Sequence, residues 1–434
     1  MKSVCVYTLG CRLNQTESEA IADSFSREGF AVVSEEERAE LYIVNTCTVT
    51  SKAEQKARRM IRLFALKAEA ILVTGCYAQM AQKELEELSD RIVVVPLEKK
   101  ASLLRLPAIV RSDLENNIPL LDSLRGFTSS ENGGVFDYQA STFSYHSRSY
   151  LKIQDGCDNE CAYCRVHVAR GKSRFLESDE VIRRALELER FGFHEIVLTG
   201  VNLTMYDHEN LGLGGLLEKL LPRLSDETRI RLSSVEADNV DQRFLDAVSS
   251  FKMHPYFHIP IQSGSDKVLR RVERKCLTDQ IEFVINGLRS AKDDPFIACD
   301  IITGLPGEGE EEFGETVDFL KRNRLAHLHV FPFSPRPDTP LERARDRVAE
   351  RVRDERAIVL RKLSEELHEE YVSRQIGKRL EVLLETRRSG SWFGTTGNYL
   401  KVNIQNAPAV SNKGMLLSGI LCERGVIRAD EVQG

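Results

Sequence analysis

The chain has 434 residues, which is enough for two to four domains with buried cores. Its hydrophobic (42%) and charged (29%) contents are those of a globular protein, and no apolar run reaches the roughly 18 residues that a membrane-spanning helix needs. A net charge of −6 does not by itself indicate a nucleic-acid partner. The opening residues lack the basic-then-apolar order of a signal peptide, so we predict a cytoplasmic protein with no membrane partner.

Short apolar runs alternate with amphipathic helical patterns over residues 1–100. The strand-like runs are SVCVYTLG (3–10), LYIVNT (41–46) and EAILVTG (69–75), and helical patterns cover 17–30 and 53–66. This β-α-β-α-β order predicts an amino-terminal α/β domain, 1–125, built on an open parallel sheet. No G-x-G-x-x-G motif follows the first strand, so the sequence does not indicate a dinucleotide site.

A cysteine follows each of these three strands. Cys11, Cys47 and Cys76 therefore fall at the carboxyl ends of the predicted strands, the edge at which open α/β sheets bind ligands. Ten cysteines in a large cytoplasmic chain favour metal binding or catalysis over a disulfide framework. The three residues form a candidate metal site without a fourth ligand. The alternative is three buried thiols that pack as small hydrophobic residues.

Periodicity is lost over residues 104–149, and we predict a linker at 126–146. A second alternating series follows, and we assign it to a domain at 147–373. Its strand-like runs are YLKIQ, EIVLTG, RIRLSSV, YFHIPI, FIACDIIT and LAHLHVFPF, with helical patterns between them. Six such units predict a partial (β/α)6 barrel, whose chemistry would lie at the carboxyl ends of the strands.

The first of these strand ends carries three further cysteines, Cys157, Cys161 and Cys164, spaced C-x3-C-x2-C. Structural zinc sites close their tetrahedron with four protein ligands, and a fourth is missing nearby. Three thiolates on a [4Fe–4S] cluster leave one iron open to an added ligand, for which S-adenosylmethionine (SAM) fits the chemistry. Spacing alone leaves open a zinc or four-cysteine site completed by Cys276 or Cys299.

The last segment, 374–434, differs in charge and pattern. It holds nine Lys and Arg against five Asp and Glu, a net of +4, whereas the rest of the chain carries −10. Its short β runs, separated by Gly, Asn and Pro, predict a small β-barrel. Trp392, Phe393, Tyr399 and Lys401 are of the types that bind nucleic acid, although the aromatic residues could equally be barrel core.

Motifs from all three segments resemble one protein family. The cysteine spacing with Tyr163 before the third cysteine resembles the radical-SAM signature. YTLGCRLNQTESEA, IVNTCTVT and VTGCYAQ resemble the amino-terminal domain of methylthiotransferases, and LKIQDGCDNECAYC, HIPIQSGSDKVL and DIITGLPGE resemble their radical-SAM domain. The carboxyl-terminal segment resembles a TRAM domain, which implies RNA binding. The resemblance covers essentially the whole chain.

This resemblance implies two [4Fe–4S] clusters, one on each cysteine triad, together with SAM and no catalytic side chain beyond the cluster ligands. One SAM would methylate a sulfur held at the amino-terminal cluster, and a second would be cleaved to a radical that takes hydrogen from an adenosine C2. Positions that match the SAM pocket of such barrels, or that are simply turn residues, are Gly200, Asn202, Gln262, Ser263, Gly304, Pro306, Gly307 and Glu308.

Within the family, TLGCRLNQTESE and NTCTVTSKAEQKAR look most like the group that modifies N6-threonylcarbamoyladenosine, the base 3′ of the tRNA anticodon. The resemblance also implies an electron donor such as flavodoxin or ferredoxin and a sulfur source. The alternatives are isopentenyladenosine or a ribosomal protein as substrate, or a non-catalytic iron–sulfur or zinc RNA-binding protein. RVHVARG, with His167 at a usual proline position, and VERKC depart from the family pattern near the active mouth.

Overall fold

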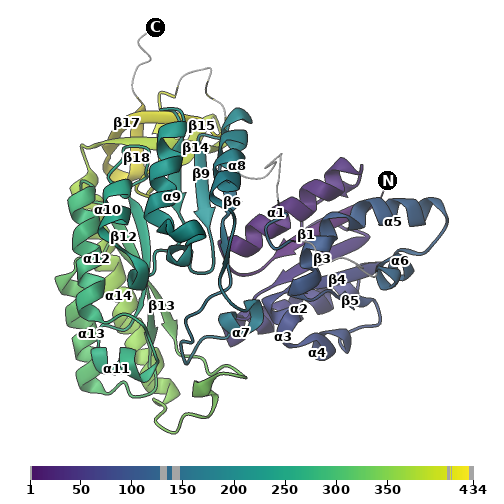
Figure 1. Cartoon of the computed structure of the whole chain (residues 1–434), viewed down its shortest axis with the longest axis horizontal. Coiled ribbons are helices and arrows are strands. Elements are labelled where there is room, and N and C mark those ends of the chain that lie inside the picture. Colours follow the sequence, from purple (N-terminus) through teal and green to yellow (C-terminus); the bar gives the residue numbers. More distant parts are fainter. Residues whose placement is uncertain (1, 128–133, 139–146, 408–410, 412, 430–434) are drawn as a thin grey trace.

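The computed structural model describes residues 2–127, 134–138, 147–407, 411 and 413–429. An amino-terminal α/β part lies beside a partial barrel, and a small closed barrel sits at one end of that partial barrel (Figure 1). Within the described residues, no helix is long and apolar enough to cross a membrane. The predicted fold class is therefore confirmed in all three of its parts.

The amino-terminal sheet is parallel throughout and has the order β2-β1-β3-β4-β5. Its strands are β1 (Ser3–Thr8), β2 (Ala31–Val32), β3 (Leu41–Thr46), β4 (Ala70–Gly75) and β5 (Ile92–Val94). Its helices are α1 (Arg12–Arg27), α2 (Ser51–Ala65), α3 (Cys76–Met80), α4 (Gln82–Glu86), α5 (Leu106–Glu115) and α6 (Leu120–Gly126). The central strands β3 and β4 are buried at every position, as expected for strands with helices on both faces.

Alternate residues of β3 face the two helical layers. Ile43 shares a core with Ile21 of α1, whereas Tyr42 packs on the opposite face against Phe64 of α2, with ring centroids 4.3 Å apart. The period of two along the strand thus explains why both flanking helices are amphipathic. The cores hold the sheet edge that carries Cys11, Cys47 and Cys76 in a fixed position.

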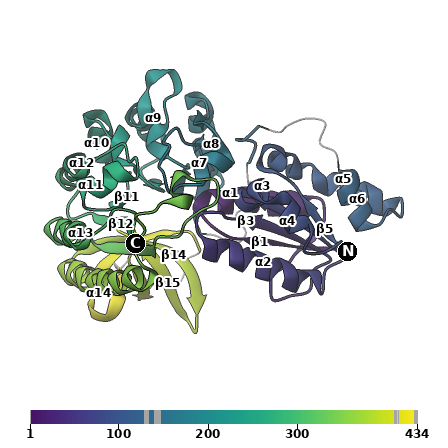
Figure 2. The ribbon, with the colours of Figure 1, turned by 90° about the horizontal axis from the view of Figure 1, so that it is seen from below.

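The partial barrel consists of six parallel strands in two three-stranded sheets, β6-β9-β10 and β11-β12-β13. The strands are β6 (Ser149–Lys152), β9 (Glu195–Thr199), β10 (Arg229–Leu232), β11 (Tyr256–Gln262), β12 (Phe296–Thr303) and β13 (His327–Pro332). A bridge between Ile230 and Met253 links the two sheets. All six predicted strands are present, and the barrel is incomplete, as the sequence predicts. Figure 2 shows the amino-terminal part beside this barrel.

Helices cover the outside of this barrel. They are α7 (Val166–Arg170), α8 (Ser178–Arg190), α9 (Gly212–Leu220), α10 (Gln242–Val248), α11 (Asp266–Arg271), α12 (Thr278–Ala291), α13 (Glu310–Arg322) and α14 (Glu350–Gln375). A two-stranded ribbon, β7 (Gln154–Asp155) and β8 (Arg174–Phe175), frames the cysteine loop. Short 3-10 helices are η1 (Leu97–Leu104), η2 (Leu203–Met205), η3 (His208–Asn210), η4 (Leu221–Arg223), η5 (Ala237–Asn239), η6 (Pro340–Arg343) and η7 (Glu423–Gly425).

The carboxyl-terminal strands close into a barrel of order β14-β15-β16-β18-β17. They are β14 (Arg379–Arg388), β15 (Ser391–Thr396), β16 (Lys401–Gln405), β17 (Leu416–Cys422) and β18 (Val426–Ala429). Its core continues into Tyr256 and Phe296, the first residues of β11 and β12, so this small barrel packs at the amino ends of strands of the partial barrel. The predicted boundary at 373/374 falls inside α14, and most of the predicted linker 126–146 lies outside the described residues.

Candidate active site between two cysteine triads

The amino-terminal triad gathers at one edge of its sheet. Cys11 precedes α1 as its N-cap, Cys47 follows β3, and Cys76 begins α3 directly after β4. Because β1, β3 and β4 are parallel neighbours, their carboxyl ends meet, and the three cysteine loops meet with them. Cys47 is buried and Cys11 is exposed, so this edge combines a protected and an open side.

Two glycines allow the loops of this triad to approach each other. Gly10 has φ of 108°, and a Cβ there would lie 2.7 Å from the Cβ of Cys47. Gly75 has φ of 99°, and a Cβ there would lie 2.3 Å from the carbonyl oxygen of Thr46. A larger residue at either position would be strained and would push the loops apart. The approach of the three cysteine loops therefore depends on two backbone positions that only glycine fits.

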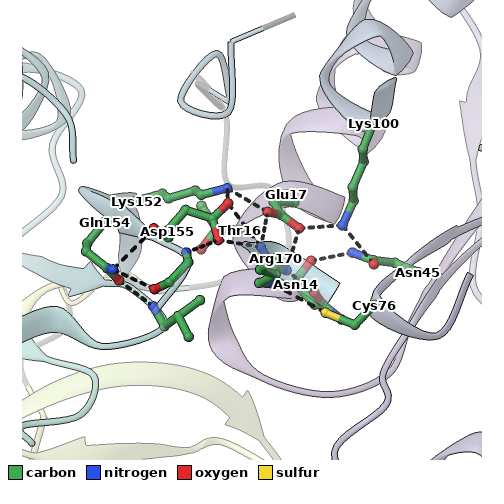
Figure 3. Close-up of polar contacts among 12 residues, drawn as sticks. Asn14, Thr16, Glu17, Asn45, Cys76, Lys100, Lys152, Gln154, Asp155 and Arg170 are labelled. Atoms are coloured by element: carbon green, nitrogen blue, oxygen red, sulfur yellow. Dashed lines mark hydrogen bonds and ion pairs between the residues drawn. The ribbon is translucent and has the colours of Figure 1, made fainter. Parts of the chain in front are cut away.

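Arg170, from the barrel, reaches into the amino-terminal triad. Its Nε donates a hydrogen bond to Sγ of Cys76 at 3.3 Å (Figure 3). Its Nη1 contacts Asp155 at 3.0 Å and Glu17 at 3.2 Å, and its Nη2 donates to Oδ1 of Asn14 at 2.8 Å. All of these side chains are buried. The guanidinium is thus fixed in orientation and directs one N–H at a cysteine sulfur.

Glu17 is the acid that holds this network together. Besides Arg170, it accepts hydrogen bonds from the buried ammonium groups of Lys100 and Lys152 (Figure 3). Burial alone would raise the pKa of Glu17, but the charges of Arg170, Lys100 and Lys152 hold it well below its ordinary value. The carboxylate is therefore ionised, and it ties the amino-terminal part to the barrel.

The second triad occupies the loop after β7. The amide N–H of Cys164 donates to the carbonyl of Cys161 at 2.9 Å in a tight turn, and the amide N–H of Cys157 donates to the carbonyl of Gly171 at 3.0 Å. Gly156, with φ of 74°, lies so close to Lys172 that a Cβ would sit 2.0 Å from its carbonyl oxygen. The loop is thus closed at both ends.

Each sulfur of this triad has a hydrogen-bond donor beside it. Nη1 of Arg274 lies 3.7 Å from Sγ of Cys161, Nδ2 of Asn202 lies 4.0 Å from Sγ of Cys157, and an amide N–H donates to Sγ of Cys164 at 3.4 Å. Burial raises the pKa of Cys157 to about 11 and that of Cys164 to about 12. Such thiols stay protonated near neutral pH until a metal replaces their protons.

Helix α7 connects the two triads directly. The amide N–H of Val166, its first residue, donates to Sγ of Cys164, and its last residue, Arg170, contacts Sγ of Cys76. Arg165, just before the helix, binds Glu54 of the amino-terminal part at 3.0 Å and Asp338 of the barrel at 2.8 Å. The unusual RVHVARG segment is therefore the physical link between the triads.

The first group of predicted SAM-pocket positions lies beside Cys157. The amide N–H groups of Val201 and Asn202 donate to Oε1 of Gln154 at 2.8 and 3.0 Å. A Cβ at Gly200 would lie 2.7 Å from the same oxygen, so glycine is needed for this close approach. Gln154 therefore fixes the turn that directs Asn202 toward Sγ of Cys157.

The other predicted positions follow β11 and β12. Gln262 has φ of 72° next to an irregularity in strand pairing, and Oγ of Ser263 lies 3.2 Å from Oγ1 of Thr316 in α13. Glu308 accepts hydrogen bonds from the amide of Gly304 and from Arg356 of α14, each at 2.8 Å. Pro306 lies in the turn between Gly304 and Glu308. In the same turn, the amide N–H of Gly307 donates a hydrogen bond to the carbonyl of Asp346 at 3.2 Å.

Comparison with known proteins places this geometry in a family. The sequence matches the uncharacterized protein family UPF0004 over residues 3–95 and the Radical SAM superfamily over residues 151–320. It is 36% identical to the threonylcarbamoyladenosine tRNA methylthiotransferase MtaB of Treponema pallidum, over 94% of this chain and all of that protein. The protein of the same name from Bacillus subtilis is 36% identical over 93% of this chain and 90% of its own length.

The chain belongs to the radical-SAM tRNA methylthiotransferases. A tRNA-2-methylthio-N(6)-dimethylallyladenosine synthase from Neorickettsia sennetsu is 32% identical over 91% of this chain and 86% of that protein. The radical SAM methyltransferase TsrM of Kitasatospora setae shares the fold, with a TM-score of 0.56 and 13% identity over 79% of this chain and 77% of that one. As a member of the family, the methylthiotransferase uses SAM and two [4Fe–4S] clusters.

The two triads of this methylthiotransferase fit such clusters. Each offers three sulfur donors, the ligand type that iron–sulfur clusters require. Guanidinium N–H groups of Arg170 and Arg274 point at Cys76 and Cys161, and hydrogen bonds and positive charge beside thiolates stabilise an anionic cluster. Cys299 lies inside β12 in the apolar core, away from the carboxyl edge where the zinc alternative would need it.

Several residues of the site carry no recognisable spacing in the sequence. Arg274 binds Glu236 at 2.6 Å beside Cys161, and the network of Glu17 with Lys100, Lys152 and Arg170 joins segments that are far apart in the chain. His258, Asp300 and His329 also converge from β11, β12 and β13, with their ligand atoms within 4.8 Å of one another. Charged residues inside otherwise apolar strands, such as Lys152 in YLKIQ, were the only signal in the sequence.

Proposed function

We propose that this methylthiotransferase modifies C2 of N6-threonylcarbamoyladenosine, 3′ of the tRNA anticodon, with one SAM as methyl donor and another as radical source. The observation that carries the proposal is the direct connection of the two triads through α7. Insertion of sulfur into an unactivated C–H needs a radical source and a sulfur source at the same base, and the two triads supply adjacent positions for them. The names of the relatives from Treponema pallidum and Bacillus subtilis support this choice of base.

In this proposal Cys11, Cys47 and Cys76 hold the cluster that carries sulfur, and Cys157, Cys161 and Cys164 hold the cluster that binds SAM. The residues proposed to line the SAM pocket are Gly200, Asn202, Gln262, Ser263, Gly304, Pro306, Gly307 and Glu308. When bound, the clusters and SAM supply the radical, the sulfur and the methyl group. The protein supplies position and exclusion of water, since no acid or base in a protein removes an aromatic C2 proton at useful rates.

The chain's own residues orient the two centres. Arg170 fixes Cys76 through its hydrogen bond, and Arg274 and Asn202 do the same for Cys161 and Cys157. Glu17 keeps the amino-terminal part seated on the barrel, because it binds Lys152 at 2.7 Å across that interface. This seating holds the amino-terminal triad against the barrel, and exclusion of solvent from such a site limits side reactions of reactive intermediates.

We also propose that the small carboxyl-terminal barrel binds tRNA. Its net charge of +4 supports this role, as do the exposed side chains of Phe393 and Lys401. An external electron donor, such as flavodoxin or ferredoxin, and a sulfur source complete the proposed set of partners. An enzyme that acts on tRNA would work in the cytoplasm.

The test compares two cysteine variants under reducing, anaerobic conditions. Cys47→Ala should produce 5′-deoxyadenosine from SAM but attach no methylthio group to tRNA bearing threonylcarbamoyladenosine, because only the sulfur-carrying centre is damaged. Cys161→Ala should produce neither. Cys422→Ala, a half-buried cysteine in the carboxyl-terminal barrel, is the matched control and should retain both products.

Normal methylthio product from Cys47→Ala would contradict the two-centre mechanism. It would mean that the first triad consists of packing residues, whose loss costs about 1 kcal/mol of stability. The same assay with tRNA bearing isopentenyladenosine tests which modified base is the substrate. This control is needed because the tRNA-2-methylthio-N(6)-dimethylallyladenosine synthase from Neorickettsia sennetsu is 32% identical to this chain. Product on that tRNA alone would refute threonylcarbamoyladenosine as the substrate.

A further inference from the structure

A cavity of about 550 Å³ opens where the three parts of the chain meet, and Cys11 lines it. Arg12 and Tyr150 contribute to its wall from the amino-terminal part and the barrel, and Tyr399, Lys401 and Lys413 contribute from the carboxyl-terminal barrel. Helix α1, which begins at Arg12, runs along the side of the partial barrel (Figure 1). The cavity therefore lies beside the triad proposed to carry sulfur.

Arg12 is held in one orientation at this cavity. Its Nη2 donates a hydrogen bond to the hydroxyl of Tyr399 at 2.6 Å, and its guanidinium carbon lies 5.3 Å from the centre of the same ring. A hydrogen bond and a cation–π contact to one residue fix the plane of the guanidinium. The remaining N–H groups of Arg12 are thus preoriented for a ligand.

Arg12 lacks a direct ion-pair partner in the part of the chain that the structure describes. Among the described residues, no carboxylate forms an ion pair with Arg12, and its Nη1 is buried without any hydrogen-bond partner. Arg148 and Lys401 of the same cavity differ in this respect, since Arg148 pairs with Glu195 at 3.2 Å and Lys401 pairs with Glu385 at 2.9 Å. A buried, unpaired guanidinium N–H is costly, so its retention here points to an anionic ligand.

A planar carboxylate is the ligand that matches this arrangement. Guanidinium binds carboxylate through two parallel hydrogen bonds, and such charge-assisted pairs are the strong ones. Threonine that is joined to N6 through a carbonyl group on its amine keeps a free α-carboxylate, which is ionised at neutral pH. In the purine ring, N1 lies between C2 and C6, and C6 bears N6. The threonylcarbamoyl substituent therefore extends from the same edge of the base as C2, the atom that must face the sulfur.

We propose that Arg12 binds the threonyl carboxylate of the substrate and thereby selects threonylcarbamoyladenosine, an inference that rests on the proposed function. Because Arg12 and Cys11 line the same cavity, a base anchored at this guanidinium lies beside the amino-terminal triad. Tyr399 is the positioning residue that holds the guanidinium. Isopentenyladenosine has no anionic group and gains nothing from this contact.

The experiment measures binding of three anticodon stem-loop RNAs to the holoenzyme under anaerobic conditions. They carry threonylcarbamoyladenosine, its threonyl methyl ester, or plain adenosine at the same position. The wild-type enzyme should bind the free carboxylate about ten- to a hundredfold more tightly than the ester. Arg12→Gln should abolish that preference and leave affinity for the plain-adenosine RNA unchanged, and Arg12→Lys should restore part of the preference.

Lys401→Gln is the matched control, since Lys401 lines the same cavity but is already paired with Glu385. It should weaken binding of all three RNAs equally, as loss of a general phosphate contact does. An Arg12→Gln enzyme that keeps its preference for the free carboxylate would overturn the inference. Equal weakening of all three RNAs in Arg12→Gln would also overturn it, because Arg12 would then bind the phosphate backbone.

The outcomes also separate this inference from the proposed function. A wild-type enzyme that forms methylthio product on threonylcarbamoyladenosine RNA, together with an Arg12→Gln enzyme that still distinguishes carboxylate from ester, refutes only the role of Arg12. A wild-type enzyme that forms no product on that RNA, but forms it on the isopentenyladenosine RNA, refutes the proposed function itself.

Discussion

Replacing Glu17 with Gln removes the acid that holds the amino-terminal part on the barrel. The substitution keeps the shape of the side chain but leaves Lys152 and Arg170 with Asp155 as their acid partner, and it leaves the buried ammonium of Lys100 with its hydrogen bond to Asn45. Loss of one partner from a buried ion pair costs about 3–5 kcal/mol, because the other charges stay desolvated. We therefore expect the free energy of local unfolding at this interface to fall by at least about 3 kcal/mol.

Amide hydrogen exchange of α1 and β6 in the holoenzyme measures this loss where it occurs. A change of about 3 kcal/mol accelerates exchange roughly a hundredfold, at about 1.4 kcal/mol for each factor of ten. Glu282→Gln is the matched control, because Glu282 pairs with Arg322 at the surface and should cost under about 1 kcal/mol. Acceleration of less than tenfold in Glu17→Gln would refute the reasoning.

The pH dependence of the same measurement has a definite sign. The pKa of Glu17 is lowered in the folded protein, so its stabilising contribution is present above its ordinary pKa of 4.5 and is lost as pH falls through the folded pKa. The difference in the free energy of local unfolding between the wild-type enzyme and Glu17→Gln should therefore shrink in acid. A difference that stays constant from pH 7 to the acid limit would show that the carboxylate charge is not its cause.

Two further outcomes follow from the geometry. Gly304→Ala should lower the melting temperature, because φ at this position is +72° and the new Cβ would lie 1.9 Å from Cγ of Arg353. Gly314→Ala is the control and should raise the melting temperature slightly, because helix α13 has open space at this position. Equal melting temperatures for the two variants would contradict this expectation. Arg387→Gln combined with Arg388→Gln, both exposed at the end of β14, should reduce the salt-dependence slope of tRNA affinity by about 2, and an unchanged slope would count against tRNA binding by the small barrel.

The two triads were predictable because their positions follow from local pattern. Each of Cys11, Cys47 and Cys76 comes directly after an apolar run of strand length, and parallel strands bring their carboxyl ends to one edge. The same rule located the C-x3-C-x2-C loop at the mouth of the partial barrel. Strand periodicity and the short spacing of the second triad suffice for these conclusions, and neither requires knowledge of how the domains dock.

The contacts between the triads could not be predicted in this way. Glu17, Lys100 and Arg170 come from three segments whose docking sets their partners, and no short-range pattern specifies it. The packing of the carboxyl-terminal barrel at the amino ends of β11 and β12 is likewise a long-range result. Tyr399 is an example. The sequence predicted that it lies in the barrel core or contacts nucleic acid, whereas in the structure its hydroxyl accepts a hydrogen bond from Arg12 of the amino-terminal part.

In the proposed mechanism, helix α7 gives a physical reason why the two centres would act on one base. Its first amide contacts Sγ of Cys164 and its last side chain contacts Sγ of Cys76, and a five-residue helix is too short to bend appreciably. Arg165 and Arg170 fix both ends of the helix to acids of the amino-terminal part, Glu54 and Glu17. The helix itself therefore sets the distance between the two triads. In the proposed mechanism, reactive groups held on the two sides would meet the substrate at a constant separation, without movement of a domain.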